Sequence, residues 1–526
     1  MYDLFIKNGK LVDGTGASVP VGHVGVQGEE IKLVEAARGE KDGGPEARSV
    51  INASGKLVCP GFIDMHAHGD FSLFERPFMP DKIWQGITTH TTGHCGFSLA
   101  PVSQQLLDNV EDVFPSAGLT SEDFRWESFA EYLAAVEKQP LGPNLSAFVG
   151  YAPVRMAVMG LSGEKANLSQ IEQMQDLLAR ALEEGAFGFT TGLAYPPQVH
   201  ATTDELVALS EVVAEHHRLY ATHIRDATYD VAGGVREAVE IAQKSGVDLH
   251  IAHMQMRPTE EHDLQEVLDT IQEAKDVGID VTFDQYPYLA GQGPLTPLFP
   301  DWSLDGPSSR VLERFEDPSQ RAKIKEYMAE VVEDYFRWHE IILWADVGRD
   351  LIGRSVQTVA HLQEKDPRDV IMDVISEHGL GIRALYFGKT EEELRAAATW
   401  PEAMVGTDGV YVEEERHNHP RTFGTFPRMI RKYALEQNSL SVEEAISRMT
   451  SLPAARLGLG DRGVLEEGRK ADILIIDPDR LRDTATYEDP IAQPEGFDCV
   501  IVNGQIVRRA GTDRRISAGK VLRPSG

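Results

Sequence analysis

Cysteine is scarce in this sequence, and the few cysteines present do not form a disulfide framework. The chain has 526 residues and three cysteines, at positions 59, 95 and 499. Small secreted domains held together by disulfides are far richer in cysteine, and widely spaced thiols fit a reducing compartment. Each thiol is therefore interpreted from its own neighbours in the sequence.

Long apolar runs and an excess of positive charge are also missing. No apolar stretch approaches the roughly 20 residues that a membrane-spanning helix needs, and the chain does not start with a basic segment followed by an apolar core. Acidic residues outnumber basic ones by 83 to 51, for a formal net charge of -32. This charge disfavours nucleic acids and anionic membranes as partners. We therefore expect a cytoplasmic protein that binds neither.

The two ends of the chain share a sequence pattern of short apolar segments separated by turn residues. Residues 1–59 contain several such segments, one of them before a predicted turn at Asn8-Gly9. The same pattern returns from about residue 460. We expect residues 1–59 plus 460–526 to form one small β domain, because the ends of a domain often lie close together.

The middle of the chain, residues 60–459, alternates short apolar runs with amphipathic helices such as 169–184, a pattern typical of βα units. The overall composition, 42% hydrophobic and 25% charged, is that of an ordinary globular protein. Eight strand candidates occur, at 62–63, 87–91, 146–149, 187–190, 220–223, 249–253, 281–284 and 403–406. They predict an α/β fold, a (β/α)8 barrel of the TIM type, with a lid-like insertion at about 291–350 between strands seven and eight. A doubly wound sheet is the alternative.

The clearest chemical motif is the pair His66 and His68, which follows the first strand candidate. Side chains alternate along a strand, so residues two apart point to the same face. Two imidazoles aimed at one spot make half of a metal site. Two histidines with this spacing are equally compatible with two polar residues at a strand end. The residues at the ends of the other strands therefore decide whether a metal site is present.

Other strand candidates end in residues of matching chemistry. The C-terminal ends of barrel strands meet at one mouth, so residues distant in sequence become neighbours there. Four such residues join the histidine pair: Cys95, His223, His253 and Asp408. A lone cysteine is more often a small buried hydrophobe, but a thiol facing histidines at the mouth is a plausible thiolate ligand.

Two further histidines are not assigned as ligands. His250 lies three residues before His253, which places the two on opposite faces of a strand, and the later one is expected to reach the mouth. His94 flanks the thiol without clearly facing the centre. We predict supporting or packing roles for both.

These ligands favour zinc. Sulfur and imidazole together select zinc over magnesium or calcium. Cys95, His223 and His253 would hold one zinc ion tightly and leave a position open for water, as a catalytic site requires. Asp408 is predicted to act as the general acid and base. Together with Asp408, the histidine pair outlines a second, weaker metal position.

Several motifs resemble the amidohydrolase superfamily and, within it, the D-aminoacylase (N-acyl-D-amino-acid deacylase) family. The resemblance covers nearly the whole chain. It is carried by Gly61-Phe62-Ile63-Asp64-x-His66-x-His68, Cys95-Gly96-Phe97-Ser98-Leu99-Ala100-Pro101, Thr191-Gly192-Leu193-x-Tyr195-x-Pro197, Thr222-His223-x-Arg225, Tyr286-Pro287-Tyr288 and His419-Pro420-Arg421. Most of the superfamily uses a carboxylated lysine or a glutamate as bridging ligand, and a cysteine there marks this branch.

The resemblance implies the same metal ligands and acid/base residue, and a reaction. The family hydrolyses N-acyl-D-amino acids to a carboxylate and a free D-amino acid with zinc. Arg421 resembles the family's clamp for the substrate α-carboxylate, a task suited to a forked guanidinium. Tyr195 and Tyr286 match family tyrosines at the substrate. The implied partner is a small N-acyl amino acid.

Three positions depart from the family pattern: Gln255 replaces a usual lysine, Tyr151 a histidine and His94 an asparagine. The lost lysine removes a positive charge from the carboxylate pocket, so an amide without an α-carboxylate, a dipeptide with a D-residue or a cyclic amide is the alternative substrate. A catalytically silent barrel with a binding role is the alternative to an enzyme. The apolar segment 294–302 favours hydrophobic substrates.

Overall fold

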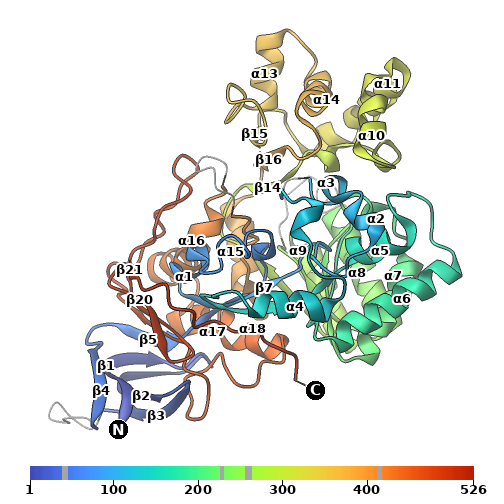
Figure 1. Ribbon diagram of the computed structural model, residues 1–526. Coiled ribbons are helices and arrows are strands. Elements are labelled where there is room, and N and C mark those ends of the chain that lie inside the picture. The colour runs from blue at the N-terminus through green and yellow to red at the C-terminus, as the bar shows by residue number, and fades with distance from the viewer. Residues whose placement is uncertain (38–44, 116, 226–229, 255–263, 412–417, 526) are drawn as a thin grey trace.

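The computed structural model describes residues 1–37, 45–115, 117–225, 230–254, 264–411 and 418–525. Figure 1 shows a central barrel wrapped by helices, a sheet built from both chain ends at its lower left, and a mostly helical unit above it. No helix in the described part of the chain is long and apolar enough to cross a membrane.

The barrel has eight parallel strand positions. They are β6 (Phe62–Asp64), β7 (Ile87–Thr92), β8 (Asn144–Ala147) continued by β9 (Val149–Gly150), β10 (Gly188–Gly192), β11 (Leu219–His223), β12 (Asp248–Ile251), β13 (Val281–Gln285) and β17 (Ala403–Val405). Hydrogen-bonded ladders run β6-β7-β8 and β9-β10-β11-β12-β13-β17. The first and last strands also meet, since Met65 N donates to Val405 O at 3.1 Å and Asp408 N to His66 O at 2.8 Å. This closure confirms the predicted barrel and excludes the open, doubly wound sheet.

Helices cover the outside of the barrel because each has one apolar face. They include α4 (Phe129–Glu137), α5 (Tyr151–Met159), α6 (Leu168–Glu183), α7 (Thr203–Glu215), α8 (Val231–Ser245), α9 (Leu264–Asp276) and α15 (Glu391–Thr399). Thr202 and Glu205 suggest a capping box for α7. Thr202 Oγ1 does accept from Glu205 N at 3.2 Å. The Glu205 carboxylate is buried and accepts from Arg155 Nη1 at 2.7 Å instead, so only half of the box forms.

Both ends of the chain contribute to one nine-stranded sheet. Its strands are β1 (Tyr2–Val12), β2 (Ser18–Gln27), β3 (Glu30–Ala36), β4 (Ala47–Asn52), β5 (Leu57–Pro60), β18 (Ile473–Ile476), β19 (Phe497–Val502), β20 (Gln505–Arg509) and β21 (Thr512–Asp513). The two ends join where β5 pairs antiparallel with β18. We propose that this sheet is the core of the domain expected at 1–59 plus 460–526.

The predicted turn at Asn8-Gly9 is wrong. Strand β1 continues through it, with shifts in register on both sides of Gly9. Asn8 has a φ of 63°, the left-handed conformation that a turn would also use, but here it forms a bulge within one strand. Gly9 is needed because a Cβ there would lie 2.4 Å from Val58 Cγ2.

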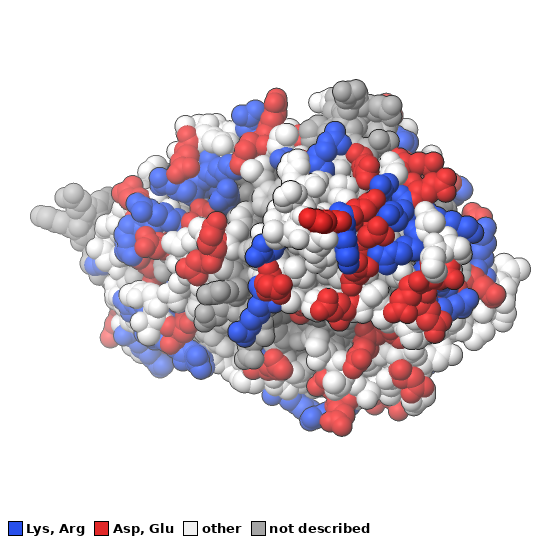
Figure 2. All heavy atoms as spheres, turned by 90° about the horizontal axis from the view of Figure 1, so that it is seen from above, with Lys and Arg blue, Asp and Glu red and all other residues white. Residues whose placement is uncertain are grey.

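The insertion between β13 and β17 forms a small unit with its own core. It contains the sheet β14-β16-β15 (Gly291–Pro294, Arg383–Tyr386, Ile341–Ala345) and the helices α10 (Ser308–Glu316), α11 (Pro318–Tyr327), α13 (Val356–Gln363) and α14 (Pro367–His378). It extends beyond the expected end near residue 350, because α13, α14 and β16 pack into the same apolar core as the earlier helices. Figure 2, which looks down on the molecule from above, shows acidic and basic side chains interspersed over this face.

Candidate metal centre

The six side chains predicted to bind metal meet at the C-terminal mouth of the barrel. Each of them ends or follows one of the strands β6, β7, β11, β12 and β17, which are far apart in the sequence. Their donor atoms fall into two groups, each with all atoms within 4.8 Å of one another: Cys95, His223 and His253, and His66, His68, Cys95 and Asp408. Cys95 belongs to both groups.

The first group has the spacing of a zinc site. Cys95 Sγ lies 3.8 Å from His223 Nδ1 and 3.6 Å from His253 Nε2. The two imidazole nitrogens are 2.8 Å apart. With zinc bonds of about 2.3 Å to sulfur and about 2.0 Å to nitrogen, tetrahedral ligands lie roughly 3.3–3.6 Å apart. The two sulfur–nitrogen distances lie within about 0.2 Å of this range, and the two imidazole nitrogens would separate by about 0.5 Å to hold one metal ion.

The second group adds a carboxylate to the imidazole and thiol donors. His66 Nε2 lies 3.4 Å from Cys95 Sγ and 3.5 Å from Asp408 Oδ1. His68 Nε2 lies 3.2 Å from the same carboxylate oxygen. The buried His68 Nδ1 has no hydrogen-bond partner among the described residues. Two imidazoles and a carboxylate can hold a second ion beside the first, with the thiolate between them.

The electrostatics of the first group favour metal binding. Burial alone would raise the pKa of the Cys95 thiol, but the imidazoles of His66, His223 and His253 hold it well below its ordinary value. Burial and His253 lower the pKa of His223. The site therefore presents a thiolate and a neutral imidazole, the forms that bind a metal ion.

The histidines of the second group favour protons when no metal is bound. Burial opposes charge on both rings, but Asp284 and Cys95 raise the pKa of His66 well above its usual value. Asp408 and Cys95 likewise raise the pKa of His68 to about 9. A metal ion bound at this second group must displace these protons.

Asp408 is ionised despite its burial. Burial by itself would raise the pKa of this carboxyl, but the Arg421 guanidinium and the neighbouring imidazoles hold it well below the ordinary range. Arg421 Nη1 lies 2.7 Å from Asp408 Oδ2. At neutral pH the side chain is thus in the carboxylate form that a general base needs.

Three of the six residues have a strained backbone. Cys95, His253 and Asp408 have φ values of 52°, 34° and 45°, in the left-handed region. Each costs on the order of 1–3 kcal/mol for a residue other than glycine, and such residues cluster at functional sites. All three residues lie just past the ends of their strands, where their donor atoms meet at the centre.

Asp284 supports this centre, and the sequence interpretation missed it. It lies near the end of β13, fully buried. Its Oδ2 lies 3.3 Å from His66 Nδ1 and 3.0 Å from His250 Nε2, and its Oδ1 accepts from His253 N at 3.1 Å. One carboxylate therefore fixes the orientation of one predicted ligand and the backbone of another, and gives the supporting His250 its contact.

Replacing Asp284 with asparagine is expected to lower zinc affinity about 10–100-fold, the usual effect of losing a partner that orients a ligand. Titration against a zinc chelator of known affinity measures this. Asp280→Asn is the matched control, because its carboxylate is exposed at the start of the same segment and pairs with Arg456. A wild-type zinc affinity in the Asp284 variant would show that this carboxylate does not orient the metal ligands.

Of the positions that depart from the family pattern, the structure places His94 beside the centre and Tyr151 away from it. The His94 ring stacks on His66 with 4.3 Å between centroids, and burial lowers its pKa well below the usual value. Tyr151 donates to the buried Glu205, away from the metal ligands. Gln255 lies outside the described residues.

The predicted substrate residues also face the centre. Tyr195 OH is 3.3 Å from His223 Nδ1. The Arg421 guanidinium lies over the Tyr286 ring, 4.5 Å from its centroid. All three residues therefore lie within reach of a molecule bound at the mouth.

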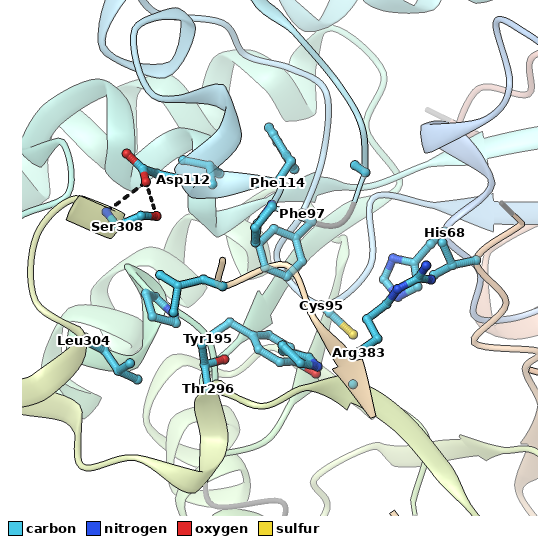
Figure 3. Close-up of a pocket in the computed structure, with 18 of the residues that line it drawn as sticks. His68, Cys95, Phe97, Asp112, Phe114, Tyr195, Thr296, Leu304, Ser308 and Arg383 are labelled. Atoms are coloured by element: carbon cyan, nitrogen blue, oxygen red, sulfur yellow. Dashed lines mark hydrogen bonds between the residues drawn. The ribbon is translucent and has the colours of Figure 1, made fainter. Parts of the chain in front are cut away.

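A pocket opens from the centre toward the insertion (Figure 3). One wall is apolar and includes Phe71, Phe97, Phe114, Leu161, Leu304 and Val311. The segment 294–302, which suggested hydrophobic substrates, contributes differently, because Leu295, Leu298 and Phe299 point into the core of the insertion. Arg383, also unforeseen, lies in the pocket with Arg421.

Comparison with known proteins agrees with this site. A model of the amidohydrolase family matches residues 49–293 and 356–508, which leaves out most of the insertion. A D-aminoacylase of Alcaligenes xylosoxydans xylosoxydans is 33% identical, covering 99% of this chain and 97% of its own. An N-acyl-D-aspartate deacylase of the same organism is 32% identical, covering 99% of this chain and 95% of its own.

Solved structures show the same architecture. A crystal structure of D-aminoacylase superposes with a TM-score of 0.83 at 30% identity, over 99% of this chain and all of the other. A zinc and phosphonate complex of N-acyl-D-glutamate deacylase from Bordetella bronchiseptica superposes with a TM-score of 0.82 at 31% sequence identity, over 99% of both chains. The chain therefore belongs to the amidohydrolase family and is a metal-dependent amidohydrolase that acts on linear amides.

Proposed function

We propose that this enzyme uses zinc to hydrolyse N-acyl-D-amino acids to a carboxylate and a free D-amino acid. The observation that carries the proposal is the thiolate and imidazole group of Cys95, His223 and His253 beside the Asp408–Arg421 ion pair. The names of the two relatives and two solved structures described above support the choice of substrate.

Asp408 is the proposed acid and base. When bound, zinc would polarise the amide carbonyl and lower the pKa of a water molecule at the centre. Asp408 accepts the proton as the water oxygen attacks the carbonyl carbon, and then donates it to the leaving nitrogen, which departs as the free amine. The proton taken at the first step is thus returned at the second.

Two tyrosines and an arginine position the substrate in this proposal. Burial and the nearby Cys95 and Asp408 raise the pKa of Tyr195 well above its usual value, so its hydroxyl stays protonated and donates to the carbonyl oxygen as charge develops there. Arg421, stacked on Tyr286, binds the α-carboxylate. The apolar wall that includes Phe97 and Phe114 holds a hydrophobic acyl or side-chain group.

Replacing Arg421 with alanine is expected to raise the KM for N-acetyl-D-leucine about 10–100-fold, because a hydrogen-bonded ion pair with a substrate contributes about 1.5–3 kcal/mol. Steady-state kinetics should be compared with N-acetyl-D-leucinamide, which lacks the carboxylate and is expected to respond much less. An equal rise in KM for both compounds would favour the alternative substrate, an amide without an α-carboxylate, whereas a fall in kcat shared by both would reflect the lost partner of Asp408.

A further inference from the structure

Arg383 is a buried cation in the pocket that opens from the metal centre, and the proposed function does not use it. It begins β16, the central strand of the insertion's sheet, and is 5% exposed. It lines the same pocket as His68, Cys95 and Asp408. Figure 3 draws Arg383, Cys95 and His68 among the side chains that line this pocket. The insertion thus delivers a guanidinium to the mouth of the barrel.

The hydrogen bonds of Arg383 are incomplete. Its Nε donates to Asp346 Oδ2 at 3.1 Å, and the Asp346 side chain is 45% exposed. The buried Nη1 has no hydrogen-bond partner among the described residues. A guanidinium offers five N–H donors in a fixed fork, and a buried donor without an acceptor is destabilising. An acceptor brought by a ligand would satisfy it.

Two arginines line the pocket, and each keeps a buried nitrogen without a hydrogen-bond partner among the described residues in addition to its ion pair with a carboxylate of the chain. The second is Arg421, whose Nε is such a nitrogen. Burial and the charge of Arg421 both lower the pKa of Arg383, so the two guanidinia act on each other. The α-carboxylate accounts for Arg421. A second anionic group on the substrate would account for Arg383.

We propose that Arg383 determines specificity by binding a second carboxylate of the substrate. This inference rests on the proposed function and narrows it to dianionic N-acyl-D-amino acids. The second carboxylate belongs either to the side chain of an acidic D-amino acid or to the end of a dicarboxylic acyl group. Both present the same planar pair of oxygens to the guanidinium fork.

Two matched pairs of substrates test the proposal and separate the two sources. The first pair is N-acetyl-D-glutamate and N-acetyl-D-glutamine. The second is N-succinyl-D-leucine and its succinamoyl analogue. The wild-type enzyme is expected to prefer the acid over its neutral analogue by about 10–100-fold in kcat/KM in one of the two pairs, the effect of one charge-assisted interaction. The pair that shows this preference identifies the source of the second carboxylate. Arg383→Gln is expected to abolish that preference and to change the neutral member less than about threefold.

Asp346→Asn is the matched control, since it breaks the same ion pair and leaves the guanidinium in place. A purely structural Arg383 predicts equal losses in both variants, whereas recognition predicts that Asp346→Asn keeps the preference. If Arg383→Gln fails to fold by its melting temperature, Arg383→Lys retains the charge without the fork and is expected to keep a reduced preference.

Two results would overturn the proposal alone: a wild-type enzyme that hydrolyses N-acyl-D-amino acids with no preference for the acid in either pair, or an Arg383→Gln variant that loses both members of a pair equally. Failure of the wild-type enzyme to hydrolyse any N-acyl-D-amino acid would instead refute the proposed function, and the inference with it.

Discussion

An Asp408→Asn variant is expected to bind zinc normally and to lose about 10²–10⁴-fold in kcat, the usual contribution of general acid and base catalysis. Asparagine keeps the shape of the side chain but cannot accept the proton. Cys95, His223 and His253, the proposed tight site, remain intact. Zinc content after dialysis and kcat on N-acetyl-D-leucine are the two measurements.

Asp112→Asn is the control for this variant, because Asp112 lines the same pocket but accepts from Ser308 N of the insertion at 2.9 Å. Its kcat is expected to stay near the wild-type value. A melting temperature for each variant separates catalysis from stability, since the Asp408 change leaves Arg421 buried without its partner. Wild-type kcat in Asp408→Asn would contradict the proposed mechanism.

A Cys95→Ala variant is expected to lose the tight zinc ion and at least about a thousandfold in kcat/KM, since the metal supplies several kcal/mol of transition-state stabilisation. Cys95 is the residue shared by both groups of donors, so its loss weakens both metal positions. Elemental analysis of the purified protein measures the zinc directly.

Cys59→Ala is the matched control for the thiol. Cys59 is buried in β5, and burial raises its pKa, so it remains a neutral thiol away from the mouth of the barrel. This variant is expected to retain zinc and activity. A Cys95→Ala protein that still carries one zinc ion after dialysis would show that the thiolate does not hold the tight metal.

The sequence predicts the positions of the six proposed ligands because one rule governs them all. Strand ends of a barrel meet at one mouth whatever the helices between them do. His66 and Asp408 therefore become neighbours, with Asp408 N donating to His66 O at 2.8 Å, although one follows the first barrel strand and the other follows the last. The same rule applies to Asp284, which lies near the end of β13, and it would have found this carboxylate.

Arg383 and Lys82 lie beyond such a rule. Arg383 reaches the pocket only because the insertion packs over the barrel, a tertiary arrangement that no local pattern indicates. Lys82 follows a proline and an aspartate at the start of a short helix, a sequence typical of an exposed turn. It is nevertheless fully buried, and its Nζ donates to Asp64 Oδ2 at 2.9 Å and Thr407 Oγ1 at 3.0 Å. Burial of a lysine depends on partners supplied by distant strands.

The most direct test of the account is the release of free amino acid from paired N-acetyl-D- and N-acetyl-L-amino acids by the zinc-loaded enzyme. The pairs should include leucine and glutamate, and an enzyme treated with a chelator and then resupplied with zinc should be run alongside. We predict release from the D-compounds, little from the L-compounds, loss with the chelator and recovery with zinc. Zinc-loaded enzyme that releases no amino acid from any D-compound would contradict the proposed function.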